Sequence, residues 1–138
     1  MKILIAFLLS ILYTASVQAQ SPTWSATKNW KIYAGEGQQV FAYPIDTLKF
    51  LSCRKLDQDT LHQFLLGAQM LGKDRTPTWM GSYLASYESP NGKINKVEVS
   101  IYGGFFYDQS SGTYYQLPRG MINDWLAYII QNMKAIQQ

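Results

Sequence analysis

The chain has 138 residues, of which 47% are apolar and only 15% charged, and its formal net charge is +3. Its basic residues are dispersed among acids, whereas a nucleic-acid-binding domain needs a clustered and much stronger basic patch, so nucleic acid is not an expected partner. Because Cys53 is the only cysteine, no internal disulfide can form, and the fold must depend on a hydrophobic core.

Residues 1–19 have the pattern of a secretory signal peptide. Lys2 is followed by an apolar run over 3–12 and by small residues at Val17 and Ala19, which predicts cleavage after Ala19. An uncleaved N-terminal anchor is the alternative, although the apolar run is short for a spanning helix. Cleavage would give an exported protein, periplasmic or extracellular, with no stable membrane anchor.

The mature chain is expected to form a single domain over 30–138, preceded by a loose leader over 20–29. The leader is polar and prone to turns, apart from Trp24. Two short strands over 30–34 and 39–43 should follow, joined as a hairpin by two closely spaced glycines.

Residues 47–56 are rich in large apolar side chains and fit either a strand or a helix. Cys53 lies in this segment and is interpreted as a small buried side chain, with an intermolecular disulfide or a reactive thiol as the alternative. An amphipathic helix should come next, because Asp57 is a good N-cap and Gly72 a good C-cap. Between them, apolar residues recur at helical spacing: Leu61, Phe64, Leu65, Ala68 and Leu71.

Residues 79–88 and 93–102 are predicted to pair as an antiparallel hairpin, because the Ser-Pro-Asn-Gly between them suits a tight turn. In the second strand Val97 and Val99 alternate with polar residues, so one face should lie in the core and the other in solvent. Pro118 should begin a final helix with an apolar stripe. The stripe comprises Met121, Ile122, Trp125, Tyr128, Ile129, Met133 and Ile136.

This order of elements predicts an α+β fold. We expect an antiparallel meander sheet of about five to six strands, with two amphipathic helices packed on one face and the C-terminal helix last. The sequence contains no repeat, low-complexity tract or linker that would divide the domain.

Residues 102–118 hold six aromatic residues in seventeen positions. Pairing Asp108 with Thr113 across a polar four-residue loop predicts a hairpin whose strands sort the large side chains onto two faces. One face would carry Phe106, Tyr115 and Leu117, and the other Phe105, Tyr107 and Tyr114. The first triplet is expected in the core. The second is either cross-strand packing or a recognition surface, and the paired glycines before the hairpin predict a bulge or bend.

We therefore predict a small exported, non-enzymatic binding module that recognises another protein, in the manner of an inhibitor or immunity-type protein. The candidate binding residues are Phe105, Tyr107, Tyr114, Tyr102 and Tyr83. The alternative is a domain that binds a glycan or a small apolar ligand in a concave, aromatic-lined sheet. The two hypotheses predict different shapes, a flat patch for the first and a pocket for the second.

No catalytic, metal or cofactor site is predicted. His62 is the only histidine, so it could act as a base for Cys53 in a hydrolase only if the two side chains came within hydrogen-bond reach. Among the acids, Asp108 is the one considered for ligand contact, because it lies beside the aromatic hairpin.

Overall fold

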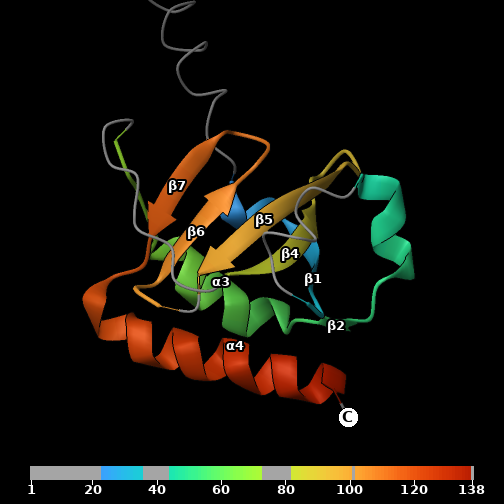
Figure 1. Cartoon of the computed structure of the whole chain (residues 1–138). Coiled ribbons are helices and arrows are strands. Elements are labelled where there is room, and N and C mark those ends of the chain that lie inside the picture. The colour runs from blue at the N-terminus through green and yellow to red at the C-terminus, as the bar shows by residue number, and fades with distance from the viewer. Residues whose placement is uncertain (1–22, 36–43, 73–81, 101, 138) are drawn as a thin grey trace, which may run out of the picture.

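In the computed structural model, residues 23–35, 44–72, 82–100 and 102–137 are described. They form a seven-stranded antiparallel sheet and two α-helices (Figure 1). The predicted α+β class is confirmed, with the C-terminal helix last and slightly more strands than expected. The predicted signal peptide, the strand over 39–43 and the loop over 73–77 lie outside the described residues.

The strands are β1 (Lys28–Tyr33), β2 (Cys53–Lys55), β3 (Gln69–Met70), β4 (Ser82–Glu88), β5 (Ile94–Ser100), β6 (Phe105–Asp108) and β7 (Thr113–Gln116). The α-helices are α3 (Gln58–Leu66) and α4 (Ile122–Gln137), and the 3-10 helices are η1 (Trp24–Ala26), η2 (Ile45–Phe50) and η3 (Arg119–Met121). The sheet order is β2-β1-β4-β5-β6-β7-β3. The helix α3 therefore carries the chain from the edge strand β2 to the opposite edge strand β3.

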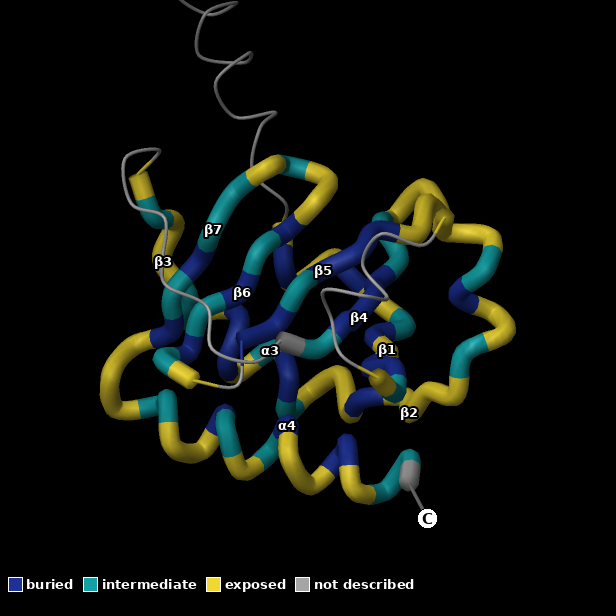
Figure 2. Tube along the Cα trace, in the orientation of Figure 1, coloured by how far each residue is buried: buried dark blue, intermediate teal, exposed yellow. Residues whose placement is uncertain are grey.

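The two α-helices pack on the same face of the sheet. One buried cluster joins Leu61, Phe64 and Leu65 of α3 and Trp125, Ile129 and Met133 of α4 to side chains from β1, β4, β5, β6 and β7. Figure 2 shows the buried positions of the strands and helices facing one another, with exposed positions along the outside of α4. Except for Leu71 and Ile122, the residues of the two predicted apolar stripes belong to this core or pack against it.

The segment predicted as strand or helix contains both kinds of structure. Its first part is η2 and its last part is the short strand β2. Asp57 caps α3 as predicted, because its side chain accepts a hydrogen bond from the Thr60 backbone N–H at 3.0 Å. The helix ends earlier than expected, with Gly67 rather than Gly72 at the C-cap. A Cβ atom at Gly67 would lie 3.3 Å from Pro118 Cγ, so this end of α3 sits close to the entry of α4.

The expectation of a loose leader over 20–29 is wrong from Trp24 onward. Trp24 is only 9% exposed and belongs to the main core cluster. Its ring centroid lies 5.2 Å from that of Tyr115 and 5.5 Å from that of Phe106, both edge-on. The Trp24 ring packs inside the aromatic cluster of the core, so the chain is part of the domain from η1 onward.

The opposite face of the sheet is also partly covered, by η2. Leu48 of η2 forms a second buried cluster with Tyr33 of β1 and Leu84 of β4. On the same face, Lys96 and Ser100 of β5 are buried, at 6% and 0% exposure, although their alternation with valines predicted a solvated face. We call the face of the sheet that carries these residues the outer face.

Candidate functional site

The aromatic hairpin β6–β7 has the register predicted from its sequence. Its pairs include Phe106–Tyr115, Tyr107–Tyr114 and Asp108–Thr113. Phe106, Tyr115 and Leu117 are no more than 4% exposed and belong to the core under the helices. The division of the rings between an inner and an outer face is therefore confirmed.

The outer aromatic face consists of Phe105, Tyr107 and Tyr114. All three side chains are half-buried, and they lie on the side of the sheet opposite to α3 and α4. The rings of Tyr107 and Tyr114 are neighbours, with centroids 4.6 Å apart and planes at 43°. The structure thus brings together three of the five predicted binding residues.

The other two candidate residues lie elsewhere. Tyr83 pairs with Val99 on the helix-covered face and packs against the core. Tyr102 is 58% exposed in the turn that follows β5, where its carbonyl accepts a hydrogen bond from Ser100 Oγ at 2.6 Å. Because Tyr83 and Phe105 point to opposite faces, these residues do not form one concave lining.

A bend of two glycines leads into this hairpin, as predicted. Gly103 and Gly104 have φ values of +78° and +67°, which are in the left-handed region. A Cβ atom at Gly104 would lie 2.9 Å from Ile122 Cγ1, and one at Gly103 would lie 2.6 Å from the Phe105 ring. The bend therefore requires glycine for both its backbone conformation and its close packing.

Asp108 does not contact solvent, so the idea that it touches a ligand directly is wrong. Its side chain is 0% exposed. One carboxylate oxygen accepts the Tyr87 hydroxyl at 2.9 Å, and the other accepts the hydroxyls of Ser110 at 2.8 Å and Ser111 at 2.7 Å. Asp108 therefore organises the loop between β6 and β7 from inside the protein.

Cys53 and His62 are not placed as a catalytic pair. Cys53 is exposed rather than buried, because β2 is a three-residue edge strand, and its pairing with Tyr33 places it toward the outer face. His62 lies on α3 in the layer that covers the other face, and its Nε2 atom is buried without a hydrogen-bond partner among the described residues. The two side chains thus belong to different layers.

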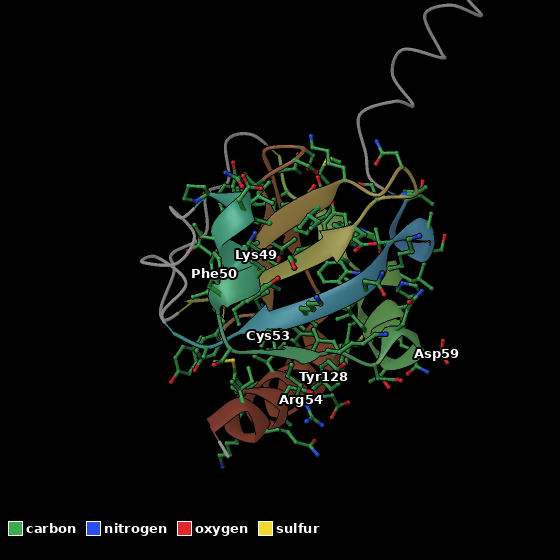
Figure 3. The ribbon with its side chains drawn as sticks, turned by 90° about the vertical axis from the view of Figure 1, so that its right-hand side faces the viewer. Lys49, Phe50, Cys53, Arg54, Asp59 and Tyr128 are labelled. Atoms are coloured by element: carbon green, nitrogen blue, oxygen red, sulfur yellow. The ribbon has the colours of Figure 1, made fainter. Side chains whose placement is uncertain are left out.

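The outer surface near Cys53 carries one prominent apolar side chain. Phe50, at the end of η2, is 79% exposed, and the Lys49 ammonium group lies 5.2 Å from its ring centroid. Figure 3 labels Phe50 at the end of η2, and Cys53 and Arg54 on the strand β2 that follows it in the chain. A single exposed aromatic residue is common on protein surfaces and does not by itself define a site.

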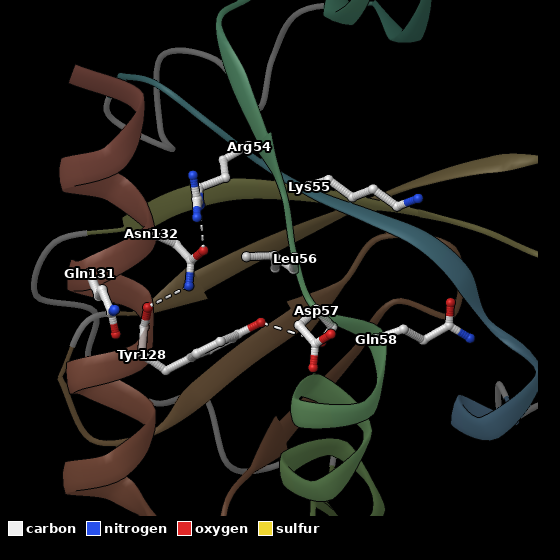
Figure 4. A pocket seen from close by; sticks show the side chains of 8 residues that line it. All are labelled: Arg54, Lys55, Leu56, Asp57, Gln58, Tyr128, Gln131 and Asn132. Carbon is white, nitrogen blue, oxygen red and sulfur yellow. Dashed lines mark hydrogen bonds between the residues drawn. The ribbon is translucent and has the colours of Figure 1, made fainter. Parts of the chain in front are cut away.

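A polar hollow of about 600 Å³ lies between β2, the start of α3 and α4. It is lined by residues 54–58 and by Tyr128, Gln131 and Asn132 (Figure 4). Two other hollows, on the exposed side of α4 and beside Ile45 and Lys93, are lined by different residues. None of the three is lined by a predicted binding residue.

Hydrogen bonds link the walls of the polar hollow. Arg54 Nε donates to Asn132 Oδ1 at 2.9 Å, and Asn132 Nδ2 donates to the Tyr128 carbonyl at 2.8 Å. The Tyr128 hydroxyl donates to the Asp57 carbonyl at 3.4 Å. Burial raises the pKa of Tyr128, and the nearby Asp57 carboxylate acts in the same direction. The phenol is therefore a stable hydrogen-bond donor at neutral pH.

Sequence reasoning did not find this hollow. Arg54 and Asn132 are 78 positions apart, and each is an ordinary polar residue in its own segment. The only local signal was two adjacent cations, Arg54 and Lys55, at the end of an apolar segment. Alternation along β2 sends these two side chains to opposite faces.

Neither a metal centre nor a membrane span is seen in the described ranges. No three His, Cys, Asp or Glu side chains there are grouped as metal ligands would be. None of the helices in the same ranges has both the length and the apolar character needed to cross a bilayer. Comparison with protein-family models, curated proteins and solved structures gives no match.

Proposed function

We propose that this chain is an exported, non-enzymatic binding module that recognises another protein through the outer aromatic face of β6–β7. The observation that carries the proposal is the grouping of Phe105, Tyr107 and Tyr114 on the face that α3 and α4 leave uncovered. An inhibitor or immunity-type role needs such a surface and no catalytic group.

The chemistry of the outer aromatic face suits protein recognition. Tyrosine combines a large apolar ring with a polar hydroxyl and loses little side-chain entropy on binding, which is why it is common among residues that dominate interfaces. Tyr107 and Tyr114 are neighbours on paired strands, so each limits the ring positions of the other. A partner would therefore meet a largely preorganised surface.

The position of Tyr83 favours a flat surface over an aromatic-lined pocket. The glycan hypothesis needed Tyr83, Tyr102 and Phe105 around one concavity, and Tyr83 lies on the face under the helices. A sugar ring could still stack on Tyr107 or Tyr114, since aromatic faces bind both kinds of partner. Glycan binding is therefore retained as an outcome of the test.

The test is affinity capture from the cell envelope and culture medium, comparing the natural chain with the Tyr107→Ser/Tyr114→Ser variant. A Phe50→Ser variant is the matched control, because it removes an exposed aromatic ring from another element. We expect one protein to be captured by the natural chain and by the control, and to be lost with the double variant. Thermal unfolding of all three chains checks that each is folded.

Three results would contradict the proposal. Equal capture by the double variant would move the interface away from the outer aromatic face. If no protein is captured, and envelope polysaccharide binds in a way that depends on Tyr107 and Tyr114, the ligand is a glycan and not a protein. A large loss of stability in the double variant would show that the two rings are needed for the fold.

A further inference from the structure

The guanidinium group of Arg54 is held in the polar hollow without using an acidic residue. Its Nε atom donates to Asn132 Oδ1 at 2.9 Å, and Asn132 is itself fixed by donating to the Tyr128 carbonyl at 2.8 Å. Figure 4 shows Arg54 reaching from β2 toward α4. The orientation of the side chain is therefore set by two hydrogen bonds in series.

The terminal nitrogens of Arg54 have no partner among the described residues. No ion pair or further hydrogen bond joins them to any of these residues. Arginine binds carboxylate groups best through two parallel N–H donors, and a fork that is already oriented loses less entropy on doing so. The two terminal nitrogens of Arg54 are therefore oriented to donate to a planar anionic group such as a carboxylate.

Asp57 lines the same hollow but does not neutralise Arg54. Its Oδ2 atom accepts the Thr60 backbone N–H at 3.0 Å and the Thr60 hydroxyl at 2.6 Å, which keeps the carboxylate at the N-terminus of α3. The Tyr128 side chain reaches from α4 to Asp57, where its hydroxyl donates to the Asp57 carbonyl (Figure 4). The negative charge of Asp57 disfavours a bound phosphate group, which can carry two charges, more than a bound carboxylate group, which carries one.

The neighbouring cation points elsewhere. Lys55 pairs with Lys31 across β1 and β2, so both ammonium groups lie on the other side of the edge from Arg54. Figure 4 shows Lys55 directed away from Asn132 and Tyr128. Lys55 therefore contributes only a general positive potential. Of the two cations, Arg54 is the one whose hydrogen-bond donors are held in a fixed orientation inside the hollow.

From these contacts we propose that the polar hollow between β2 and α4 is a carboxylate-binding site, with Arg54 as the bidentate ligand of the acid. Gln131 and the half-exposed Tyr128 line the space beside it, and about 600 Å³ leaves room for the body of the molecule that carries the carboxylate. The site is separate from the outer aromatic face. It goes beyond the proposed function because it assigns a second ligand and its chemistry.

The alternative is that Arg54 only ties the edge strand β2 to α4. A tether needs the Nε hydrogen bond to Asn132 but no acid, and its loss would lower stability without affecting any ligand. The two roles are therefore separated by measuring binding and unfolding on the same variants.

The experiment is an NMR titration of the purified protein with three probes: succinate, a tetraglutamate peptide and inorganic phosphate. The Arg54 Nε–H signal and the backbone amides of residues 55–58 report on the hollow. We expect at least one carboxylate probe to shift these signals and Arg54→Gln to weaken its binding by about tenfold or more, as for the loss of a charge-assisted hydrogen-bonded pair. Arg54→Lys should weaken binding too, because it keeps the charge and loses the fork.

The matched control is Lys31→Gln, which removes an equal charge from the neighbouring strand β1 at an exposed residue that does not line the hollow. A small effect of Lys31→Gln beside a large effect of Arg54→Gln supports the site, and so does carboxylate binding that is unchanged in the Tyr107→Ser/Tyr114→Ser variant. Similar binding of succinate and peptide would identify a small free acid as sufficient, whereas binding of the peptide alone would identify an acidic segment of a partner.

Three results would overturn the assignment. The first is the absence of any shift with either carboxylate probe. The second is equal weakening by Lys31→Gln and Arg54→Gln, which would show that the effect is general electrostatics. The third is binding of phosphate that is tighter than that of the carboxylate probes and depends equally on Arg54, which would show that the site binds phosphate groups.

Discussion

The hydroxyl of Tyr87 on β4 donates a 2.9 Å hydrogen bond to the carboxylate of Asp108 at the end of β6, and both residues are at most 2% exposed. Strand β5 lies between them in the sheet. The contact therefore joins the loop of the aromatic hairpin to the centre of the sheet, and fixes the end of the hairpin that carries Tyr107.

Replacing Asp108 by Ala should lower the free energy of unfolding by about 3 kcal/mol or more. The change removes the carboxylate that accepts from the Tyr87, Ser110 and Ser111 hydroxyls, and leaves the buried Tyr87 hydroxyl only its longer 3.2 Å contact with Ser110 Oγ. Each buried polar group left unsatisfied costs about 1–3 kcal/mol. Urea unfolding followed by tryptophan fluorescence measures the change.

Ser110→Ala is the control for the loop of the hairpin. It removes one donor to Asp108 and the 3.2 Å hydrogen bond between Ser110 Oγ and the Tyr87 hydroxyl, at a residue that is itself exposed, so we expect a loss of about 1 kcal/mol. Asp108→Asn keeps an acceptor oxygen and should fall between the two. A loss below 1 kcal/mol for Asp108→Ala would show that water replaces the carboxylate and that the loop is not organised by it.

Stability should fall as the pH rises above 10, and Tyr87 should account for part of the fall. Burial raises the pKa of Tyr87 well above its ordinary value of 10.0, and the Asp108 charge adds to the effect. Between pH 10 and that raised pKa, the folded state keeps the phenolic proton and the unfolded state loses it. The unfolded state then binds fewer protons, so stability decreases with pH, by at most about 1.4 kcal/mol per pH unit for one group.

The Tyr87→Phe variant isolates this contribution. It should be less stable than the natural chain at pH 8, since a buried hydrogen bond is lost, and its stability should fall less steeply from pH 10 to 12. Burial also lowers the pKa of Lys96, so this group makes stability rise with pH below 10.5. Both chains contain Lys96, so its contribution cancels in the difference between their stabilities. Parallel alkaline slopes for the two chains would contradict the assignment to Tyr87.

Elements with strong local signals were predictable. The register of β6–β7 followed from a polar loop of defined length and strict alternation of the rings, which is why Tyr107–Tyr114 and Phe106–Tyr115 were paired correctly. The glycine bend was predictable for a similar reason, because two glycines inside a strand pattern usually mark a bulge or a tight bend. In both cases the deciding contacts are between residues close in sequence.

Features that depend on distant contacts were not predictable. Trp24 is a lone apolar residue in a polar segment, and only the folded core shows the aromatic cluster that receives it. Lys96 is buried on the outer face, against which η2 packs from another part of the chain. The link between Arg54 and Asn132 joins an edge strand to the last helix and leaves no periodic pattern in the sequence.

Replacing Trp24 by Ala should lower the free energy of unfolding by about 3–5 kcal/mol. The side chain is 9% exposed and packs against the rings of Trp30, Tyr87, Phe106 and Tyr115. Removing a large aromatic side chain from a core loses its burial and leaves a cavity. Denaturant unfolding of this variant should be compared with that of Ser25→Ala, an exposed neighbour that should change stability by no more than about 0.5 kcal/mol. Equal stability of the two variants would show that residues 24–26 are a loose leader and not part of the core.

Replacing Gly104 by Ala should destabilise the protein and also disturb the outer aromatic face. Its φ of +67° disfavours a side chain by about 1–2 kcal/mol, and the added Cβ atom would lie 2.9 Å from Ile122 Cγ1 at the start of α4. Gly120→Ala is the matched control, since a Cβ atom there meets nothing within 4 Å. Thermal unfolding should show a lower Tm for Gly104→Ala alone. Because Gly104 sets the direction in which β6 leaves the bend, the same variant should shift the Tyr107 and Tyr114 ring signals in NMR spectra, and unchanged signals would show that the bend does not position those rings.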